Sequence, residues 1–393
     1  MKKKILIVAS SLSTGGLEKS IINLLDNFDY DSYEVDLYLF NEGRTLLEKL
    51  NKNVNLLPDS PYYASVYNRP FGESVKTLLK AKKFRLLLYR VGRFIRSRLK
   101  LKKFTVSDFK HMKKTMLKID KHYDVAIGYE EGTACYYVAD LVSADKKIGW
   151  IHTDIKKIDS NKKLDKKAFE KLDYVVTVSQ NSLNNLAEVY PLYKDKYRCI
   201  SIGKLVNEDE LAVLSNMPNS MDKNAIKILS IGRLVELKGF HLCVPVLKML
   251  KDDGFNVKWY VAGEGDYRRY IEEEIERYGL KGDFILLGNC DNPYTLINSA
   301  DICVQPSSYE GYSLAVCEEK YFKKPVVVTN IPSNLEIIDD GVNGIIVKRE
   351  VDDIYRGVKA LVCDNDLREK LGSAFANGYL ENRELIKMIT DLF

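Results

Sequence analysis

The chain has 393 residues, of which 46% are hydrophobic and 29% are charged. This composition excludes disordered, fibrous and collagen-like proteins, and the length fits two globular domains of ordinary size. The seven cysteines are scattered without a CxxC pair, and there are four histidines. A disulfide scaffold or a zinc ribbon is therefore not expected, and a reducing compartment suits the cysteines.

The charge is distributed unevenly. The net charge is +5, but residues 76–121 carry seventeen Lys and Arg against only Asp108 and Asp120, so the rest of the chain is net negative. Such a concentrated basic excess predicts an anionic partner near this stretch. The N-terminal lysines precede an apolar run of only five residues, Ile5 to Ala9. This run is too short for a signal peptide or a spanning helix, so we expect a buried strand and a cytoplasmic protein.

Short β-branched runs alternate with helical patterns along the first half of the chain, as in parallel sheets built from βαβ units. A helix is predicted over 15–26 and another over 165–172. The predicted strands are Ile5–Ala9, Glu34–Phe40, Val54–Leu57, Asp124–Gly128, Lys147–Ile151, Tyr174–Val178 and Lys196–Ile202.

A second series with the same plan follows. Its predicted strands are Ile226–Ile231, Val257–Ala262, Phe284–Leu287, Ile302–Gln305, Val326–Thr329 and Gly344–Val347, with a helix over 240–250. We therefore expect an N-terminal α/β domain over 1–205 with a basic insertion at 76–121, a linker over 206–225 and a C-terminal α/β domain over 226–375. Residues 376–393 are expected to form a helix that packs back towards the N-terminal domain.

Glycines follow the first strand of each half. Gly15 and Gly16 stand before a helix, where glycine lets the backbone approach a ligand and free amides attract phosphate. Alone, this motif is more often a simple tight turn. In the second half, Arg233 and Lys238 lie at the carboxyl edge of the predicted sheet, where two cations match a diphosphate. A pair of solvated loop charges is an equally good interpretation of these two residues taken alone.

The segment from Pro306 to Glu318 is the richest in functional residue types. A strand leads into a loop with Glu310, and a helix is predicted to start near Ser313 and to carry Glu318 about two turns in. The amides at the start of this helix could hold an anion, and the two carboxylates could reach different parts of an extended ligand. His152 follows a strand of the first half, again at a carboxyl edge, although a lone histidine is more often a packed or surface residue.

These motifs, taken in this order, resemble the family 4 (GT4) glycosyltransferases, which are retaining enzymes with the GT-B fold. The likeness rests on Gly15-Gly16, on Ile231-Gly232-Arg233-Leu234 with Lys238-Gly239, on Gly263-Glu264-Gly265, on Glu310 with Glu318, and on the run from Glu336 to Val347. It is strong over 226–348 and weaker in the first half. The resemblance implies two Rossmann-like, doubly wound parallel-sheet domains facing each other across a cleft. The acceptor is expected on the N-terminal domain and the nucleotide-sugar donor, expected to be a UDP-sugar, on the C-terminal one.

The resemblance also implies roles for individual residues. Arg233 and Lys238 would neutralise the donor diphosphate, helped by the backbone amides at Gly16, Leu314 and Ala315. Glu318 would accept hydrogen bonds from the ribose, Glu310 would hold a hydroxyl of the transferred sugar, and His152 would contact that sugar. The remaining residues assigned to the donor site are Gly15, Gly263, Leu287, Tyr312 and Ser313. The resemblance further implies that no metal is required, because fixed cations and helix dipoles can stabilise the leaving group.

A basic amphipathic helix is predicted over 84–99. Phe84, Leu87, Leu88, Val91, Ile95 and Leu99 share one side, and Arg85, Arg93, Arg96, Lys100 and Lys103 fall on the opposite side. One interpretation is binding to the anionic inner face of the plasma membrane, where a polyprenyl-diphosphate-linked glycan acceptor would be presented. The other is an ordinary helix that packs its apolar face on the domain. Nucleic acid is not expected as a partner, because no nucleic-acid module accompanies the charge.

Two rival functions stay open at this point. A nucleotide-sugar epimerase shares the two-domain architecture, but it is not expected to combine Glu310 and Glu318 with Arg233 and Lys238. A non-catalytic protein that binds a nucleotide sugar or a membrane is the other rival.

Overall fold

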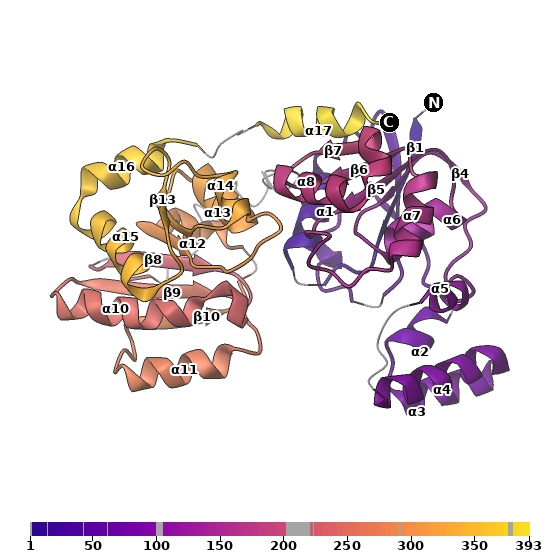
Figure 1. Cartoon of the computed structure of the whole chain (residues 1–393), viewed down its shortest axis with the longest axis horizontal. Coiled ribbons are helices and arrows are strands. Elements are labelled where there is room, and N and C mark those ends of the chain that lie inside the picture. Colours follow the sequence, from indigo (N-terminus) through magenta and orange to yellow (C-terminus); the bar gives the residue numbers. More distant parts are fainter. Residues whose placement is uncertain are drawn as a thin grey trace. The chain divides into compact units, whose positions relative to one another are not determined.

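The computed structural model describes residues 2–13, 15–41, 43–60, 62–99, 105–201, 221–222, 224–290, 292–375 and 380–393. The described chain divides into two compact units, which we call unit 1 (residues 1–202 and 382–393) and unit 2 (residues 203–381). Each unit contains its own parallel sheet with helices packed on it (Figure 1). Most of the predicted linker, 206–225, lies outside the described residues.

Unit 1 is built on a seven-stranded sheet with the strand order β3-β2-β1-β4-β5-β6-β7, in which every pair of neighbours is parallel. The centre of the sheet is buried: β1 carries the continuous apolar run Ile5–Ala9, as helix-covered parallel strands require. The strands are β1 (Lys3–Ala9), β2 (Tyr33–Leu39), β3 (Asn55–Leu56), β4 (His122–Gly128), β5 (Ser143–Ile151), β6 (Tyr174–Thr177) and β7 (Tyr197–Cys199).

The helices of unit 1 connect these strands, and four of them lie together between β3 and β4. These four are α2 (Tyr63–Tyr67), α3 (Phe71–Lys80), α4 (Phe84–Arg98) and α5 (Val106–Met112); the others are α1 (Gly16–Asp26), α6 (Thr133–Leu141), α7 (Lys162–Lys171) and α8 (Gln180–Val189), with short 3₁₀ turns η1 (Leu47–Lys49) and η2 (Pro191–Lys196). Figure 1 shows α3 and α4 standing away from the sheet of unit 1. A separate apolar cluster around Val66, Leu78 and Leu86 holds this helical insertion together.

The C-terminal helix α17 (Asn382–Thr390) belongs to unit 1 by its contacts. The ring of Phe393 stacks on the ring of Phe28, with 6.3 Å between the centroids. It also meets the ring of Tyr33 edge-on, at 5.8 Å between centroids. Asn382 also donates a hydrogen bond from Nδ2 to Asn27 Oδ1 at 3.1 Å. The last residues of the chain therefore complete the N-terminal unit, while 376–379 lie outside the described residues.

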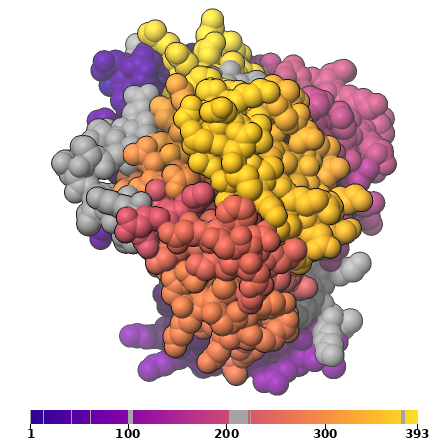
Figure 2. Space-filling view, turned by 90° about the vertical axis from the view of Figure 1, so that its left-hand side faces the viewer, coloured from indigo at the N-terminus to yellow at the C-terminus, as the bar shows by residue number. Residues whose placement is uncertain are grey.

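Unit 2 repeats the plan with six parallel strands in the order β10-β9-β8-β11-β12-β13. The strands are β8 (Ile226–Ile231), β9 (Val257–Ala262), β10 (Phe284–Gly288), β11 (Ile302–Gln305), β12 (Val326–Thr329) and β13 (Ile345–Val347). The helical elements are η5 (Glu236–Lys238), η6 (Phe240–Leu242), α10 (Cys243–Asp252), α11 (Arg268–Arg277), α12 (Tyr294–Ser299), α13 (Leu314–Tyr321), α14 (Pro332–Leu335), α15 (Val351–Cys363) and α16 (Asn365–Ser373). Figure 2 shows one face of this unit, with α15 and α16 in yellow beside α10 and α11 in salmon and orange.

In each sheet the strand order reverses at one point, the topological switch point, which is where α/β proteins bind ligands. In unit 1 this switch lies between β1 and β4, and in unit 2 it lies between β8 and β11. The expected fold of two Rossmann-like, doubly wound domains is confirmed. One local expectation is wrong: the α-helix predicted over 240–250 does not begin at Phe240, where the 3₁₀ turn η6 stands instead. Gly239 adopts φ of +77°, which ends η5, and α10 begins only at Cys243.

Candidate functional site

The candidate donor site lies at the carboxyl edge of the unit 2 sheet, around the switch between β8 and β11. Three loops meet there, following β8, β9 and β11. Their close approach depends on glycine: a Cβ built on Gly263, whose φ is +143°, would lie 2.0 Å from the carbonyl oxygen of Gly232. Gly263 also donates a backbone hydrogen bond to Gly288 O at 2.7 Å, so the loops after β8, β9 and β10 are tied together.

The centre of the site is an ion pair between two predicted residues. Lys238 Nζ donates to Glu310 Oε1, and the two side chains are only 18% and 15% exposed. Ser307 Oγ donates to the same carboxylate oxygen at 2.8 Å. Two groups 72 residues apart in sequence are thus held as one polar unit, with a cation and a carboxylate available to a ligand at the sheet edge.

Backbone contacts fix the loops that carry this pair. Ser308 N donates to Leu237 O at 2.7 Å, which joins the loop after β11 to η5. Arg349, just beyond β13, donates from Nε to Pro306 O and from Nη2 to Glu236 O, each at 3.2 Å. Arg349 therefore braces both loops, and sequence reasoning missed it. Its only signal was a cation two residues past the end of a predicted strand.

Helix α13 points its N-terminus towards the same loop. Ser313 is the N-cap residue, and among the described residues its hydroxyl accepts no capping hydrogen bond from the first turn. The Ser313 hydroxyl therefore does not compete for the backbone amides of Leu314 and Ala315, and these amides can donate hydrogen bonds to an anion. Tyr312 and Ser313 are buried, and Leu314, Ala315 and Glu318 are half-buried. Glu318 is the fifth residue of α13, so it lies just over one turn into the helix and not about two turns in, as expected, because the helix begins at Leu314.

Arg233 and Leu287 belong to neighbouring parts of the same edge. Arg233 lies in the loop after β8 with an exposed side chain, and Leu287 is a half-buried residue of β10. The structure thus joins Lys238 directly to Glu310, and it places Arg233, Gly263 and Leu287 on the adjoining loops and strand end of unit 2. An exposed guanidinium is free to swing towards an incoming phosphate.

Unit 1 has a corresponding edge between β1 and β4. Gly15 is the N-cap of α1, and Gly16 is the first residue of the helix. A Cβ on Gly15 would lie 2.3 Å from Glu18 Oε2, so the Glu18 carboxylate folds back over the helix start. Ser13 Oγ donates to Glu18 Oε1 at 3.4 Å. The first turn of α1 therefore carries a carboxylate close to the amides that were assigned to phosphate.

Glu130 is a second feature of this edge that sequence reasoning missed. It follows β4, and Ser10 Oγ donates to its Oε2 at 3.0 Å. Its other oxygen, Oε1, is buried and has no hydrogen-bond partner among the described residues. Burial raises the pKa of Glu130 to about 7, against the lowering effect of the Ser10 hydrogen bonds. The carboxyl group is thus partly protonated at neutral pH, and no motif in the sequence indicates this.

His152 stands directly after β5. Its backbone N–H donates to Glu131 Oε2 at 2.9 Å, and its ring lies 5.0 Å from the ring of Tyr129 between centroids. Burial lowers its pKa to about 4, which outweighs the opposing effect of Glu131. His152 is therefore neutral at physiological pH. Its Nε2 is buried without a partner among the described residues, so it can exchange a hydrogen bond with a ligand hydroxyl but contributes no charge.

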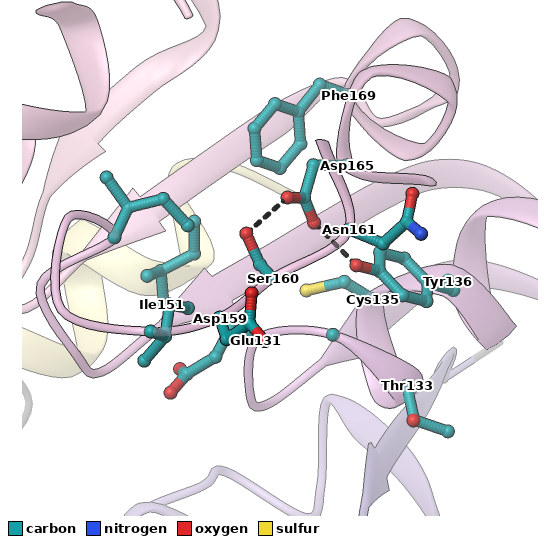
Figure 3. Close-up of a pocket in the computed structure, with 13 residues that line it drawn as sticks. Glu131, Thr133, Cys135, Tyr136, Ile151, Asp159, Ser160, Asn161, Asp165 and Phe169 are labelled. Carbon is teal, nitrogen blue, oxygen red and sulfur yellow. Dashed lines mark hydrogen bonds between the residues drawn. The ribbon is translucent and has the colours of Figure 1, made fainter. Parts of the chain in front are cut away.

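A pocket of about 190 Å³ lies beside this region of unit 1, lined by residues that include Glu131, Cys135, Ile151 and Asp159. Asp165, which also lines it, accepts hydrogen bonds from Tyr136 Oη at 2.6 Å and Ser160 Oγ at 2.7 Å (Figure 3). Tyr190 donates to the same carboxylate at 2.7 Å. These bonds account for Asp165 as a structural residue, whereas Glu131 connects the pocket to His152.

The arginines assigned to a membrane face are placed differently from the expectation. Arg93 lies 4.8 Å from the centroid of the Tyr67 ring, and Arg96 forms an ion pair with the buried Asp108 at 2.5 Å. The expected helix is confirmed as α4, but the side bearing Arg93 and Arg96 packs inward. The reason is that Asp108 and the aromatic rings of the insertion offer these cations partners. Of the apolar residues expected to share one side, four are exposed and two, Leu87 and Val91, are half-buried. Arg85 is exposed; Lys100 and Lys103 lie outside the described residues.

The described residues contain neither a membrane-spanning helix nor a cluster of metal ligands. None of the helices in the described ranges is both long enough and apolar enough to cross a membrane. Within the same ranges, no cluster of three or more His, Cys, Asp or Glu side chains is arranged to hold a metal ion.

Comparisons with known proteins point to one class. Residues 216–377 match the family model described as glycosyl transferases group 1. An uncharacterized glycosyltransferase, MJ1607, of Methanocaldococcus jannaschii is 29% identical over 224 residues, which cover 52% of this chain and 57% of that protein. A Campylobacter jejuni protein named N-acetylgalactosamine-N,N'-diacetylbacillosaminyl-diphospho-undecaprenol 4-alpha-N-acetylgalactosaminyltransferase is 27% identical over 216 residues, covering 53% of this chain and 56% of that protein.

Among solved structures, Anabaena Alr3699/HepE in complex with UDP has a TM-score of 0.67 at 15% identity, covering 100% of this chain and 99% of that one. At this identity the likeness establishes the fold, which is GT-B. In sequence, the chain spans little more than half the length of the two relatives described above.

Proposed function

We propose that the protein is a glycosyltransferase that moves a hexose or N-acetylhexosamine from a UDP-sugar to a glycan acceptor. The GT-B fold and the family match over 216–377 support this class. A structural neighbour that holds UDP supports the choice of base. The proposal includes membership of family 4, retention of configuration at the transferred sugar, and catalysis without a bound metal.

The Lys238–Glu310 pair is the observation that carries this proposal. A half-buried ammonium at a sheet edge, held by a carboxylate and next to a helix N-terminus, suits the binding of a diphosphate beside a sugar hydroxyl. Lys238 and Arg233 neutralise the diphosphate as it leaves, and the amides at Leu314 and Ala315 assist. Glu310 accepts a hydrogen bond from the transferred sugar.

The remaining roles follow the same scheme. Glu318 accepts hydrogen bonds from the ribose of the nucleotide, and Gly263 and Leu287 line the donor with Tyr312 and Ser313. In unit 1, the amide of Gly16 beside Gly15 is assigned to the diphosphate. The neutral His152 is assigned to a hydroxyl of the donor sugar, which matches its unpartnered Nε2.

We propose a lipid-linked acceptor at the inner face of the plasma membrane. The Campylobacter relative, whose name specifies a diphospho-undecaprenol acceptor, supports this choice. The basic excess over 76–121 supports it independently, because anionic lipids attract such a segment. The product is then an intermediate in the synthesis of a surface glycan.

A donor screen tests the proposal. Thermal unfolding is followed with UDP-, GDP- and ADP-sugars, and selective stabilisation by one base is expected. The Arg233→Ala and Lys238→Met variants should lose that stabilisation, while Arg269→Ala on the exposed surface of α11 should keep it. A protein that ignores all sugar nucleotides contradicts the proposal. Conversion of the donor to its epimer without an acceptor would favour the epimerase alternative, and binding without any turnover would favour a non-catalytic role.

A further inference from the structure

Helix α4 exposes one continuous apolar face. Phe84, Leu88, Ile95 and Leu99 are 59%, 72%, 51% and 64% exposed. Their spacing of four, seven and four residues places them on one side of the helix, and we call this set the α4 stripe. Isolated exposed leucines are common on soluble proteins, but four large apolar side chains on one helix face indicate an interaction surface.

The opposite side of α4 is the one that packs. Leu86 is buried in the small cluster with Val66 and Leu78, and Arg90 lies 5.4 Å from the centroid of the Phe71 ring. Arg90 also donates from Nη2 to Arg69 O at 3.1 Å. Because this side is already engaged, the helix cannot bury the α4 stripe on α3 without breaking these contacts. The stripe is thus left for something outside unit 1.

Charge indicates what covers it. Arg85 and Arg98 flank the stripe and are both exposed, and the neighbouring segment adds further exposed cations: Lys76, Lys80, Lys82 and Lys83. An apolar face bordered by cations is the pattern of a helix that lies in the surface of an anionic bilayer. An apolar protein partner or a second copy of this chain would gain nothing from so many uncompensated positive charges.

We propose that the α4 stripe inserts into the acyl-chain boundary of an anionic bilayer, with Arg85 and Arg98 at the level of the phosphate groups. This inference deepens the proposed function and rests on it, because insertion of the stripe would hold the glycosyltransferase where a lipid-linked acceptor is presented. Insertion of the stripe also replaces the expected membrane binding through Arg93 and Arg96, since those side chains face Tyr67 and Asp108. Insertion depends on apolar side chains, so high salt weakens it without abolishing it.

Co-sedimentation with vesicles is the first test. The full chain is mixed with vesicles of phosphatidylcholine and phosphatidylglycerol, or of phosphatidylcholine alone, and binding is expected only to the anionic mixture. The double variant Leu88→Ser, Ile95→Ser should lower the partition coefficient by about tenfold or more, because both side chains enter the bilayer boundary. Leu192→Ser, at an equally apolar residue of η2 that is 84% exposed, is the matched control and should bind like the wild type.

Fluorescence gives a second, independent measurement. Both native tryptophans, Trp150 and Trp259, are fully buried in their own units, so a tryptophan introduced by Leu88→Trp reports on the stripe. Its emission should shift to the blue with anionic vesicles and be quenched by brominated lipid, whereas that of Leu192→Trp should not. Unchanged emission from Leu88→Trp on bound protein overturns the proposal. So does unaltered binding of the double variant, or a dimer in light scattering that Leu88→Ser dissolves.

Failure of this inference can be told from failure of the proposed function. The wild type and the double variant are both titrated with UDP by thermal shift. If UDP stabilises both and neither binds vesicles, only the membrane inference fails. If UDP stabilises neither, the glycosyltransferase proposal fails, and the vesicle result still decides whether the α4 stripe binds lipid.

Discussion

The Lys238–Glu310 pair gives a prediction in which one substitution moves two measurements in opposite directions. In the ligand-free protein Glu310 neutralises Lys238, and both side chains are mostly buried. A diphosphate that approaches Lys238 must compete with this carboxylate and is repelled by it. Glu310→Gln removes the negative charge and keeps the size of the side chain, so it should tighten the binding of UDP while it destabilises the empty protein.

Both magnitudes follow from the geometry. Breaking a fully buried ion pair costs about 3–5 kcal/mol, and because this pair is partly exposed we expect a loss of about 2 kcal/mol in the free energy of unfolding. Removing one competing charge from a phosphate site is worth about 1–2 kcal/mol, so the dissociation constant of UDP should fall by about tenfold. Lys238→Met should destabilise the protein by a similar amount but weaken UDP binding by about tenfold or more.

The measurements are urea unfolding of the ligand-free variants and calorimetric titration with UDP. Titration with UDP, which lacks the sugar, separates the charge effect from the proposed contact of Glu310 with a sugar hydroxyl. Glu273→Gln is the control, because Glu273 pairs with Arg269 on the surface of α11 and is 61% exposed. It should change neither quantity. If Glu310→Gln weakens UDP binding as Lys238→Met does, the carboxylate is not a competitor and the reasoning is refuted.

Three further predictions concern stability. Burial raises the pKa of Glu130 from an ordinary value of 4.5 to about 7, so its ionised form is penalised in the folded protein and stability is lost as the pH rises from about 4.5 through 7. Glu130→Gln should raise the unfolding free energy at pH 8 by up to about 3 kcal/mol and leave the value at pH 4 unchanged, with Glu188→Gln as surface control. Gly263→Ala should cost about 3 kcal/mol or more by urea unfolding, because its Cβ meets Gly232 O, whereas Gly282→Ala, also at positive φ but in open space, should cost about 1 kcal/mol. Burial alone would raise the pKa of Asp108, yet hydrogen bonds from Arg96, Tyr89 and Thr105 lower it to about 2. The stabilising effect of the ionised Asp108 is therefore present above pH 4 and is lost as the pH falls to 2. Asp108→Asn should lower the unfolding free energy by about 1.5–3 kcal/mol at pH 7 and should reduce the loss of stability at acid pH.

Sequence reasoning alone recovered most of the fold. Buried parallel strands are short runs dominated by apolar residues, so β8, β9, β11 and β12 were predicted with the bounds that the structure gives them. The weaker boundaries were those set by local backbone geometry. The helix after β8 begins later than expected because Gly239 takes a left-handed conformation and a 3₁₀ turn, η6, follows it before α10, which residue types alone do not specify.

The sequence also determined which residues could bind an anionic ligand, because loops at the carboxyl ends of parallel strands must share one edge of a sheet. It could not determine which of them touch. Lys238 and Glu310 are 72 residues apart, and their pairing depends on loops that Ser308 and Arg349 hold in place. The buried state of Glu130, and hence its raised pKa, depends on the packing of β1 against β4.

Helix α4 separates the two kinds of information most clearly. Its periodicity established that one face is apolar and the other basic, since that follows from residue spacing alone. Which face is covered was decided by partners elsewhere in the chain: Asp108 of α5 takes Arg96, and the Tyr67 and Phe71 rings take Arg93 and Arg90. A helix pattern specifies two faces, but only the surrounding side chains select the one that meets the protein.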